Sequence, residues 1–306
     1  MKKPKVIVIC GPTASGKTAL SIELAKKIDG EIISADSMQI YKDMDIGTAK
    51  PNIEEMQGIK HYLLDCVSPD IRYSVAEYKQ DATKAIEEIL QKGKTPIIVG
   101  GTGLYIDALI YGIEYNDIKI DEQYRSELEK IVAKQGLETL YKMAIKIDEE
   151  AMKKISVNDK KRIMRVLEIY KATGKTKTQQ EIESRKKGVK YDYKVFALNM
   201  DREVLYNRIN LRVDLMIEKG LIEEVQRLKE KYNKFPTAMQ GLGYKEVVEY
   251  LEKKVTKEEM IEKIKMETRR YAKRQLTWFR KNKETIWLDA TKEKDYNVGQ
   301  IINYIS

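Results

Sequence analysis

The fold of this chain is decided by one stretch, Gly11-Pro12-Thr13-Ala14-Ser15-Gly16-Lys17-Thr18. A short apolar run, Val6 to Cys10, precedes it and has the length of a fully buried strand. After it, apolar residues recur at helical spacing from Leu20 to Ala25. A strand, a glycine loop with a G-x-x-x-x-G-K-T core and a helix together form a phosphate-binding loop. An ordinary glycine turn is the weaker alternative in this context.

The residues of this loop suit a di- or triphosphate group. Gly11 and Gly16 let the backbone curl so that successive N–H groups point inward, and the following helix adds its positive dipole end. Lys17 supplies a charge for the outer phosphate, and Thr18 offers a hydroxyl to Mg²⁺. The loop therefore predicts the kind of ligand, but it does not predict the reaction.

Length and composition describe a globular protein without a membrane span. The chain has 306 residues, of which 42% are hydrophobic and 34% are charged, and it has no apolar run of about twenty residues. Its first residues run straight into a strand, so we expect no signal peptide. We expect Cys10 and Cys66 to be buried free thiols in a reducing cytoplasm. A zinc site is not expected, because the chain has a single histidine, His61.

The net charge of +9 is unevenly distributed along the chain. Residues 1–114 carry −2, residues 115–190 carry +6 and residues 191–306 carry +5. The basic excess therefore lies outside the part that contains the phosphate-binding loop. A nucleic-acid partner would explain this excess, whereas a kinase of a small molecule does not need it. A lysine-rich solubility surface is an equal alternative on charge alone.

Strands alternate with helices in the first and last parts of the chain. Strands are expected at 31–35, 61–67, 96–99, 193–200 and 285–288, and long helices at 74–92, after Asp201 and at 257–282. This alternation predicts an α/β fold of the P-loop NTPase-like kind, a parallel sheet flanked by helices. Asp36 follows the strand 31–35, at the edge where such sheets bind ligands, and is a site candidate. A helix N-cap is the alternative for Asp36.

The middle of the chain differs from the rest. It contains helical patterns at 121–135, 137–145, 148–154 and 158–172 and no convincing strand. We therefore expect three parts: a first part of the P-loop core at 1–114, an all-helical insert at 115–190, and a return to the core with basic C-terminal helices at 191–306.

The helix expected at 158–172 carries an unusual charge pattern. Asn158 is expected to cap it, yet Lys160, Lys161 and Arg162 fill its first turn, where the helix dipole disfavours cations. Arg165 follows three residues after Arg162 and lies on the same face. An external anion would explain this arrangement. We interpret the face as a contact with a phosphate backbone, and a merely solvated surface is the alternative.

Two more basic regions lie in the last part of the chain. Arg208 and Arg212 sit four residues apart beside an apolar helical stripe, where they are well placed to clamp phosphates. Ion pairs with Asp214 or Glu218 are the alternative. The helix at 257–282 ends in RRYAKRQLTWFRK (269–281), in which basic residues alternate with aromatic ones. That composition suits RNA, whose bases stack on rings while its phosphates meet cations.

Several blocks of the chain, taken in order, resemble tRNA dimethylallyltransferases, which transfer an isopentenyl group to an adenosine beside the anticodon. The blocks are GPTASGKT (11–18), ISADSMQIYKDMDIGTAKP (33–51), PIIVGGTGLYIDAL (96–109), NDKKRIMRVLE (158–168), GLGYKE (241–246) and AKRQLTWFR (272–280). The resemblance covers nearly the whole chain. It implies dimethylallyl diphosphate and the anticodon stem-loop of a tRNA as partners and Mg²⁺ as cofactor. We expect a cytoplasmic monomer that does not bind membranes.

The resemblance implies roles for residues near the phosphate-binding loop. Asp36 matches the general base that accepts a proton from the adenine N6 amine. Arg212, with Arg208, matches an arginine-bearing helix that covers the leaving diphosphate. Lys17 and Thr18 would act on the diphosphate oxygens and Mg²⁺. The remaining candidate contacts to the diphosphate are Gly11, Pro12, Thr13, Ala14, Ser15 and Gly16.

The resemblance also implies tRNA contacts in five separate blocks. They are Asp36, Ser37, Met38 and Gln39, then Thr102, then Lys161, Arg162 and Arg165, then Gln240, Gly243, Tyr244 and Lys245, and finally Lys273, Arg274, Gln275, Trp278 and Arg280. The chain departs from the family pattern at three points, because Lys161 stands where a glutamine is usual, Asp43 where a glycine is usual and the single His61 where a histidine pair is frequent. None of these departures removes a residue that the chemistry needs.

Two other functions are alternatives. A P-loop kinase of a small metabolite would use Asp36 to activate a hydroxyl, with Arg208 and Arg212 as a lid, and it would consume ATP. A nucleotide-dependent RNA-binding switch would hydrolyse its nucleotide when RNA binds. Neither alternative explains the positive surplus together with the blocks at 96–109 and 272–280.

Overall fold

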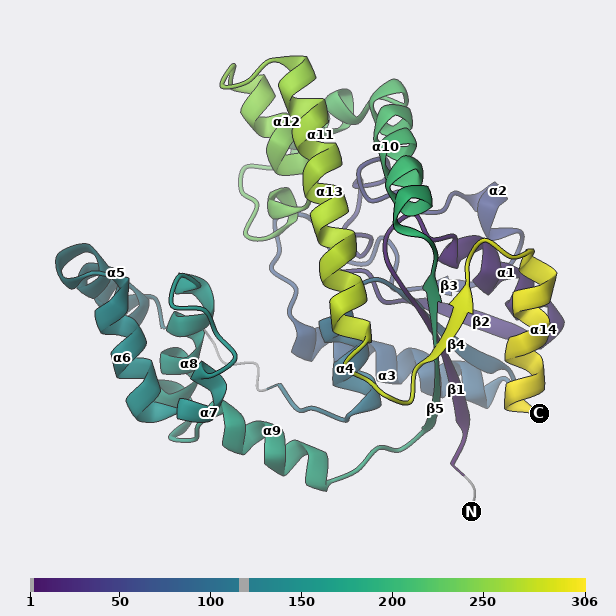
Figure 1. Ribbon diagram of the computed structural model, residues 1–306, viewed down its shortest axis with the longest axis horizontal. Helices are drawn as coiled ribbons and strands as arrows, with labels where there is room; N and C mark the ends of the chain where they lie inside the picture. The colour runs from purple at the N-terminus through teal and green to yellow at the C-terminus, as the bar shows by residue number, and fades with distance from the viewer. Residues whose placement is uncertain (1–2, 116–120) are drawn as a thin grey trace. The chain divides into compact units, whose positions relative to one another are not determined.

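A six-stranded parallel sheet carries the phosphate-binding loop in the computed structural model, which describes residues 3–115 and 121–306 (Figure 1). The strands are β1 (Lys5–Cys10), β2 (Gly30–Ser34), β3 (His61–Tyr62), β4 (Thr95–Gly100), β5 (Asp192–Asn199) and β6 (Ile286–Asp289). Their order across the sheet is β3-β2-β4-β1-β5-β6. The predicted α/β fold with a parallel sheet is confirmed.

The register of the sheet brings three loops to one edge. Cys10, the last residue of β1, pairs with Gly100 of β4 on one side and with Ala197 of β5 on the other. All three strands run in the same direction, so the segments that follow them emerge together. The phosphate-binding loop therefore lies beside the second glycine turn, Gly100 to Gly103, at the carboxyl edge of the sheet.

The chain divides into two compact units. One consists of Met1–Asp107 and Lys190–Ser306, and the other consists of Ala108–Val189. The helices of the first unit are α1 (Lys17–Lys27), α2 (Ile53–Met56), α3 (Val75–Gln91), α10 (Arg202–Glu218), α11 (Leu221–Lys231), α12 (Tyr244–Leu251), α13 (Lys257–Phe279) and α14 (Lys294–Ile305), with a short 3₁₀ turn at Ala238–Gln240. Helix α4 (Gly103–Ile110) begins in this unit and ends in the second.

Two hydrophobic cores hold the first unit together. In the first core, Ile7 and Ile9 of β1 pack with Leu24 of α1 and Ile301 of α14, all of them fully buried. The second core joins the loop after β2 to helices α10 to α13, and Tyr41, Met44 and Tyr244 are among its buried members. The second core thus fixes the loop that follows Asp36 against a layer of helices.

The strand expected at 61–67 is much shorter than predicted. It ends at Tyr62, because Leu63 and Asp65 adopt left-handed backbone conformations with φ of 61° and 54°. The apolar run that follows His61 therefore turns away from the sheet. Cys66 lies beyond this turn and is exposed, so the prediction that it is buried was wrong, whereas Cys10 is buried as expected.

The described part of the second unit is built from helices only. They are α5 (Glu122–Gln135), α6 (Leu137–Ile147), α7 (Glu149–Met152), α8 (Lys160–Thr173) and α9 (Lys177–Lys186). They enclose their own core, in which Leu128, Leu140 and Ile163 are almost fully buried. Helix α9 was not expected from the sequence, although Thr176 and Gln179 form a capping box at its start.

The cap of helix α8 is a correction to the sequence-based prediction. Asp159, not Asn158, caps the helix, since its side chain accepts a hydrogen bond from the backbone N–H of Arg162 at 3.1 Å. An acidic cap offsets part of the cationic first turn. Among the described residues of both units, no helix is long and apolar enough to cross a membrane.

Candidate active site

The phosphate-binding loop has the strained backbone that its sequence predicts. Gly11 and Gly16 have φ of 144° and 91°, and Ala14 between them has φ of 62°. An added Cβ at Gly11 would lie 3.0 Å from the carbonyl oxygen of Leu198 in β5, so only glycine fits there. The curled backbone wraps around the Lys17 ammonium group, which donates to the carbonyls of Gly11 at 3.1 Å and Pro12 at 2.7 Å.

The charges of Lys17, Arg212 and Asp36 act on one another at this loop. Burial and, to a smaller extent, the positive charge of Arg212 lower the pKa of Lys17 to about 8, while Asp36 opposes the shift. Burial also lowers the pKa of Arg212, and here the carboxylates of Asp36 and Glu55 oppose the shift. Lys17, Arg212 and Asp36, three of the four predicted catalytic residues, therefore lie within electrostatic reach of one another, and the fourth, Thr18, follows Lys17 in α1.

Asp36 is held in a tight turn after β2. Its Oδ1 accepts a hydrogen bond from the backbone N–H of Met38 at 2.9 Å, and a longer one from that of Gln39 at 3.4 Å. The turn does not continue into a helix, so Asp36 is not the helix N-cap considered as the alternative. Its half-buried carboxylate lies at the carboxyl edge of the sheet, in the field of two cations.

The second glycine turn supports Asp36 from the neighbouring strand. Thr102 accepts the backbone N–H of Ser37 on its hydroxyl at 3.0 Å and donates its own N–H to the carbonyl of Ala35 at 3.1 Å. The two segments approach so closely that a Cβ at Gly100 would lie 2.1 Å from the Ala35 carbonyl oxygen. The second glycine turn thus has a specific use in holding the Asp36 segment.

Helix α13 contributes a residue that sequence reasoning missed. Tyr271 lies near Asp36, and burial together with the charge of Asp36 raises the pKa of its hydroxyl. The same helix places Trp278 on the second glycine turn, and its indole N–H donates to Asp107 at 2.9 Å. The seven-residue spacing of Tyr271 and Trp278 indicates one helix face and was a usable signal.

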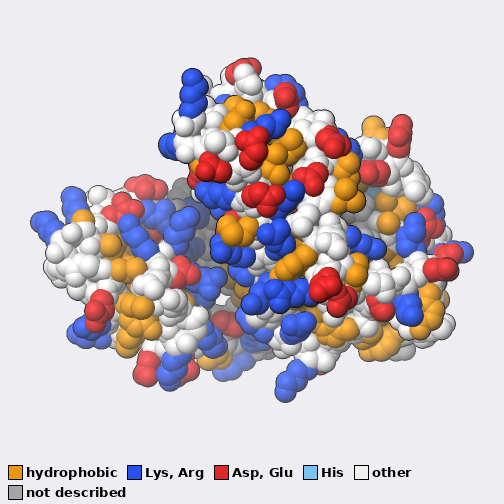
Figure 2. Space-filling model, turned by 45° about the horizontal axis from the view of Figure 1, so that its top comes forward, with side chains coloured by type: hydrophobic (Ala, Val, Ile, Leu, Met, Phe, Trp, Pro, Cys, Tyr) orange, Lys and Arg blue, Asp and Glu red, His pale blue; other side chains and the backbone are white. Residues whose placement is uncertain are grey.

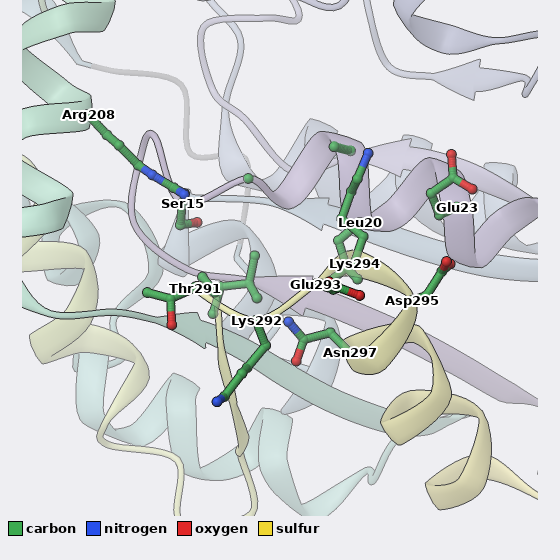
Figure 3. Close-up of a pocket in the computed structure, with 14 residues that line it drawn as sticks. Ser15, Leu20, Glu23, Arg208, Thr291, Lys292, Glu293, Lys294, Asp295 and Asn297 are labelled. Carbon is green, nitrogen blue, oxygen red and sulfur yellow. The ribbon is translucent and has the colours of Figure 1, made fainter.

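Arg208 and Arg212 come from helix α10, as expected. Figure 3 shows the Arg208 side chain reaching from α10 toward Ser15 of the phosphate-binding loop. The hydroxyl of Ser15 is buried and has no hydrogen-bond partner among the described residues. Among the described residues these arginines form neither of the ion pairs considered as alternatives, with Asp214 or Glu218, and Asp214 pairs with Lys265 at 2.8 Å. Arg208 lines a cavity together with Ser15, and Arg212 lines another together with Thr18.

Two cavities flank the start of helix α1. The cavity in Figure 3 has a volume of about 580 Å³ and lies between Ser15, Arg208 and the first turn of α14. The other, of about 500 Å³, is lined by Thr18, Arg212 and the loop 45–52. A diphosphate bound at Thr18 would therefore have space beside it on either side of the helix.

The loop 45–52 is anchored by a buried carboxylate that the sequence analysis did not single out. Glu224 of α11 is only 2% exposed. It accepts three backbone N–H groups and one hydroxyl, from Asp45 at 3.0 Å, Ile46 at 2.7 Å, Gly47 at 3.1 Å and Tyr244 at 2.6 Å. No periodicity marks such a residue, since its partners lie far away in the sequence.

The predicted tRNA contacts fall into exposed, half-buried and buried residues, and the half-buried ones are Asp36, Ser37, Met38, Gln39, Thr102, Arg165 and Trp278. The exposed ones are Lys161, Arg162, Gln240, Lys245, Lys273, Arg274 and Arg280. Figure 2 shows Lys and Arg side chains gathered over parts of the surface. In contrast, Gly243, Tyr244 and Gln275 are buried, and the side chains of Tyr244 and Gln275 are hydrogen-bonded inside the first unit. The side chains of Tyr244 and Gln275 thus support the fold in this structure.

The arginines of helix α8 have acidic neighbours within the second unit. The Arg162 Nε lies 3.1 Å from a carboxylate oxygen of Asp159, and Arg165 lies 3.5 Å from Glu168. Glu168 is buried and also pairs with Arg125 at 2.9 Å. Arg162 is the more exposed of the two arginines, so it is the better placed to meet an external phosphate.

A model of the family described as IPP transferase matches residues 39–282, which is well over half of the chain. The chain belongs to the IPP transferase family. The predicted resemblance to enzymes that prenylate tRNA is thereby confirmed, and the enzyme class is that of the transferases.

Named relatives of this family are similar over their whole length. A tRNA dimethylallyltransferase from Acetivibrio thermocellus is 53% identical over 301 residues, which cover 98% of this chain and 96% of the relative. A second one, from Bacillus mycoides, is 46% identical and covers 100% of this chain and 95% of the relative.

Solved structures of IPP transferases share the fold. The tRNA isopentenylpyrophosphate transferase from Bacillus halodurans has a TM-score of 0.74 at 44% identity, covering 99% of this chain and 96% of that one. A eukaryotic dimethylallyltransferase described as acting on tRNA has a TM-score of 0.77 at 36% identity, covering 94% and 74% respectively.

Proposed function

We propose that this IPP transferase family member transfers a dimethylallyl group from dimethylallyl diphosphate to N6 of an adenosine next to the anticodon of a tRNA. The observation that carries the proposal is that Arg212 lines a cavity with Thr18 of the phosphate-binding loop, where the charges of Arg212 and Asp36 act on Lys17. Two cations there suit a leaving diphosphate, and one carboxylate suits a proton acceptor. A kinase would need the same loop but not the basic surface outside it.

The adenine amine must be activated for this reaction. Its lone pair is delocalised into the ring, so N6 is a poor nucleophile. The Asp36 carboxylate accepts a proton from N6 while the new N–C bond forms, and such general-base catalysis supplies on the order of 10²–10⁴-fold in rate. The Met38 N–H that donates to Asp36 Oδ1 at 2.9 Å keeps the carboxylate oriented.

The second requirement is a partner for the leaving group. The C–O bond of dimethylallyl diphosphate breaks, and its electron pair stays on the diphosphate. Backbone N–H groups of the loop 11–18, the Lys17 ammonium and the guanidinium of Arg212 stabilise this growing charge, with Arg208 assisting from α10. Lys17 exchanges its present carbonyl partners, Gly11 and Pro12, for diphosphate oxygens.

The residues present fit one Mg²⁺ bound together with the diphosphate. Thr18 is exposed at the start of α1 and lines a cavity with Arg212, so its hydroxyl is available. The described residues contain no group of three or more His, Cys, Asp or Glu that could hold a metal, so phosphate oxygens and water would supply the other ligands, as Mg²⁺ prefers. When bound, the ion would neutralise charge on the leaving group.

The tRNA partner fits the basic regions. The exposed cations Lys273, Arg274 and Arg280 of the first unit and Arg162 of the second would contact phosphates of the anticodon stem-loop. The target adenosine must leave its stack to reach Asp36. We propose that the enzyme works as a monomer in the cytoplasm, with residues 115–190 as a tRNA-contacting insert.

The proposal is tested by incubating the protein with labelled dimethylallyl diphosphate, Mg²⁺ and unmodified tRNA. We expect prenylated adenosine after digestion to nucleosides and release of diphosphate, with no consumption of dimethylallyl diphosphate when tRNA is omitted. A parallel reaction with labelled ATP and candidate small-molecule acceptors provides the comparison. Steady turnover of ATP to ADP, without prenylated nucleoside in the first reaction, would favour a kinase instead.

A further inference from the structure

One side chain of helix α13 joins the phosphate-binding loop to the second glycine turn. The amide of Gln275 donates from Nε2 to the carbonyl of Gly101 at 2.9 Å, and its Oε1 accepts the backbone N–H of Thr13 at 2.9 Å. Gln275 is 5% exposed, so both hydrogen bonds are shielded from water. An unmade hydrogen bond would be costly at such a position.

The second glycine turn is shaped to receive this helix. An added Cβ at Gly101 would lie 2.2 Å from Gln275 Nε2, and one at Gly103 would lie 2.4 Å from Trp278 Cδ1. Gly101 does not have a left-handed backbone, so its lack of a side chain serves the approach of Gln275. The turn and the helix thus fit each other at two successive contacts.

The connection continues from the second glycine turn to the proposed general base. Thr102, next to Gly101, accepts the N–H of Ser37 at 3.0 Å, and Ser37 directly follows Asp36. Hydrogen bonds therefore run from Thr13 of the phosphate-binding loop through Gln275 to the second glycine turn, and from that turn to the Asp36 segment. Among the hydrogen bonds of the described residues in this path, only those of the Gln275 side chain reach both the phosphate-binding loop and the second glycine turn.

We propose that Gln275 is a positioning residue that fixes the spacing between the diphosphate-binding loop and Asp36, instead of a residue that contacts tRNA. This inference rests on the proposed function. The reacting carbon is held by the loop and N6 is held at Asp36, so their separation depends on how the two segments are joined. A misplacement of about 1 Å can cost on the order of 10²-fold in rate.

The test compares Gln275→Met with the parent protein. Methionine keeps the length and most of the volume of the side chain but neither donates nor accepts these two hydrogen bonds strongly. We expect the single-turnover rate on preformed complexes to fall by on the order of 10²-fold. The separately measured Kd values for dimethylallyl diphosphate and tRNA should stay close to those of the parent. A parental single-turnover rate would overturn the proposal, whether or not tRNA binding weakens.

Thr268→Val is the matched control for lost stability. Thr268 is also buried on α13, and its hydroxyl donates at 2.7 Å to the Ile264 carbonyl of the same helix, away from both turns. We expect a lower Tm but a parental single-turnover rate. If this control slows transfer as much as Gln275→Met does, general loosening of α13 explains the effect and the proposal fails.

Gly101→Ala gives an independent check, because its methyl group should displace the Gln275 amide. We expect Gly101→Ala to slow transfer in the parent but not to slow it further in a Gln275→Ala background, where the space is free. Additive losses would contradict the proposed contact.

Amide hydrogen exchange separates this inference from the proposed function. Absence of any prenylated nucleoside with the parent would contradict the proposed function alone. The exchange of the Thr13 amide would still report on the link: faster exchange of loop 11–16 in Gln275→Met supports it, and unchanged exchange overturns it.

Discussion

At the scale of single residues, the active site depends on three charges that come from separate elements. Lys17 begins α1, Asp36 follows β2 and Arg212 lies on α10. The two cations destabilise each other in the buried site, and the carboxylate offsets part of this cost. A bound diphosphate would relieve the repulsion between the cations. Two of the three charges in the site, those of Lys17 and Arg212, therefore favour a bound anion.

Asp36→Asn should separate proton transfer from binding. Asparagine keeps the size of the side chain and an acceptor oxygen, but it does not accept a proton at neutral pH. We expect kcat to fall by on the order of 10²-fold or more, because general-base catalysis is lost. Affinities for tRNA and dimethylallyl diphosphate should change little. Single-turnover rates at two Mg²⁺ concentrations are the measurement, and rates close to the parent's would refute the assignment.

The lowered pKa of Lys17 predicts how diphosphate binding varies with pH. With a pKa of about 8, the charged fraction of Lys17 falls from roughly nine-tenths near pH 7 to roughly one-tenth near pH 9. We expect the affinity for dimethylallyl diphosphate to weaken over this range and binding near pH 8.5 to take up a proton. Calorimetry in buffers of different ionisation enthalpy measures the uptake, and Lys17→Met should lack it.

The same shift has a consequence for folding stability. An unfolded lysine keeps its proton up to a pKa of 10.5, whereas Lys17 in the fold releases it near 8. Between these values the unfolded chain binds more protons, so this group's contribution to stability rises with pH. The Tm of the parent should therefore rise relative to that of Lys17→Met as the pH rises through this window.

At the scale of elements, the loop 45–52 and helix α8 have different roles. The loop is held in place by a buried anchor, and the helix presents charge to solvent. The loop carries few apolar residues, and a carboxylate on another helix holds its backbone in place. Helix α8 carries its cations outward from a buried apolar face that includes Ile163 and Leu167. The first arrangement shapes a cavity beside Thr18, and the second presents charge to solvent.

Glu224→Gln should loosen the loop that lines the Thr18 cavity. Glutamine replaces one acceptor oxygen by an amide that donates, so at least one buried donor of the loop or Tyr244 loses its partner. We expect a stability loss of about 1–3 kcal/mol and weaker binding of dimethylallyl diphosphate. Urea unfolding and ligand titration measure these effects. Glu223→Gln, one residue earlier, serves as the control, and equal losses in both variants would refute the anchoring role.

Replacing Arg162 and Arg165 by alanine should weaken the grip on tRNA. Each lost phosphate contact lowers the slope of log Kd against log salt by about one unit or less. Arg165 already pairs with Glu168, so we expect most of the effect from Arg162. Lys142→Ala on α6, which removes a cation paired with Glu138, is the control. An unchanged salt slope with collapsed turnover would contradict the proposed role of α8.

Much of the fold was predictable from the sequence because its signals are local. The phosphate-binding loop, the buried strands 96–99 and 193–200 and the capped helix 74–92 are each encoded within a few residues. The strand predicted at 61–67 was too long, because the left-handed conformations of Leu63 and Asp65 that end it cannot be recognised from the apolar pattern of the sequence. The burial of Gln275 was not predicted, since a polar residue within a basic stretch gives no indication of burial.

At the scale of the whole molecule, the second unit has its own core and its own buried polar network. Leu128, Leu140 and Ile163 form part of that core, and Glu168 is buried between Arg125 and Arg165. These are the properties of a segment that can fold alone, although a unit of this size buries a smaller share of its surface than a larger one.

We expect a fragment of residues 108–189 to fold by itself and to bind tRNA weakly. Its helices should give a cooperative thermal transition by circular dichroism, because the core is complete within the fragment. Glu168→Leu with Arg125 and Arg165 retained should lower that transition, since two cations lose their partner. A non-cooperative signal for the unsubstituted fragment would show that the unit depends on the rest of the chain.

The two cysteines differ in exposure, so their rates of modification by a thiol reagent can report how fast the sheet opens. Cys66 is exposed, so it should react with thiol reagents in the native state, although partial burial of its thiol and the charge of Asp65 raise its pKa and slow the reaction. Cys10 ends β1 beneath the phosphate-binding loop, and burial raises its pKa to about 12, so it should stay unmodified until the central strand parts from its neighbours. The modification rate of Cys66 therefore gives the reactivity of the reagent, and the modification rate of Cys10 gives the rate at which the sheet opens. Ligands that bind at the phosphate-binding loop should slow the modification of Cys10, and no engineered label is needed to measure this.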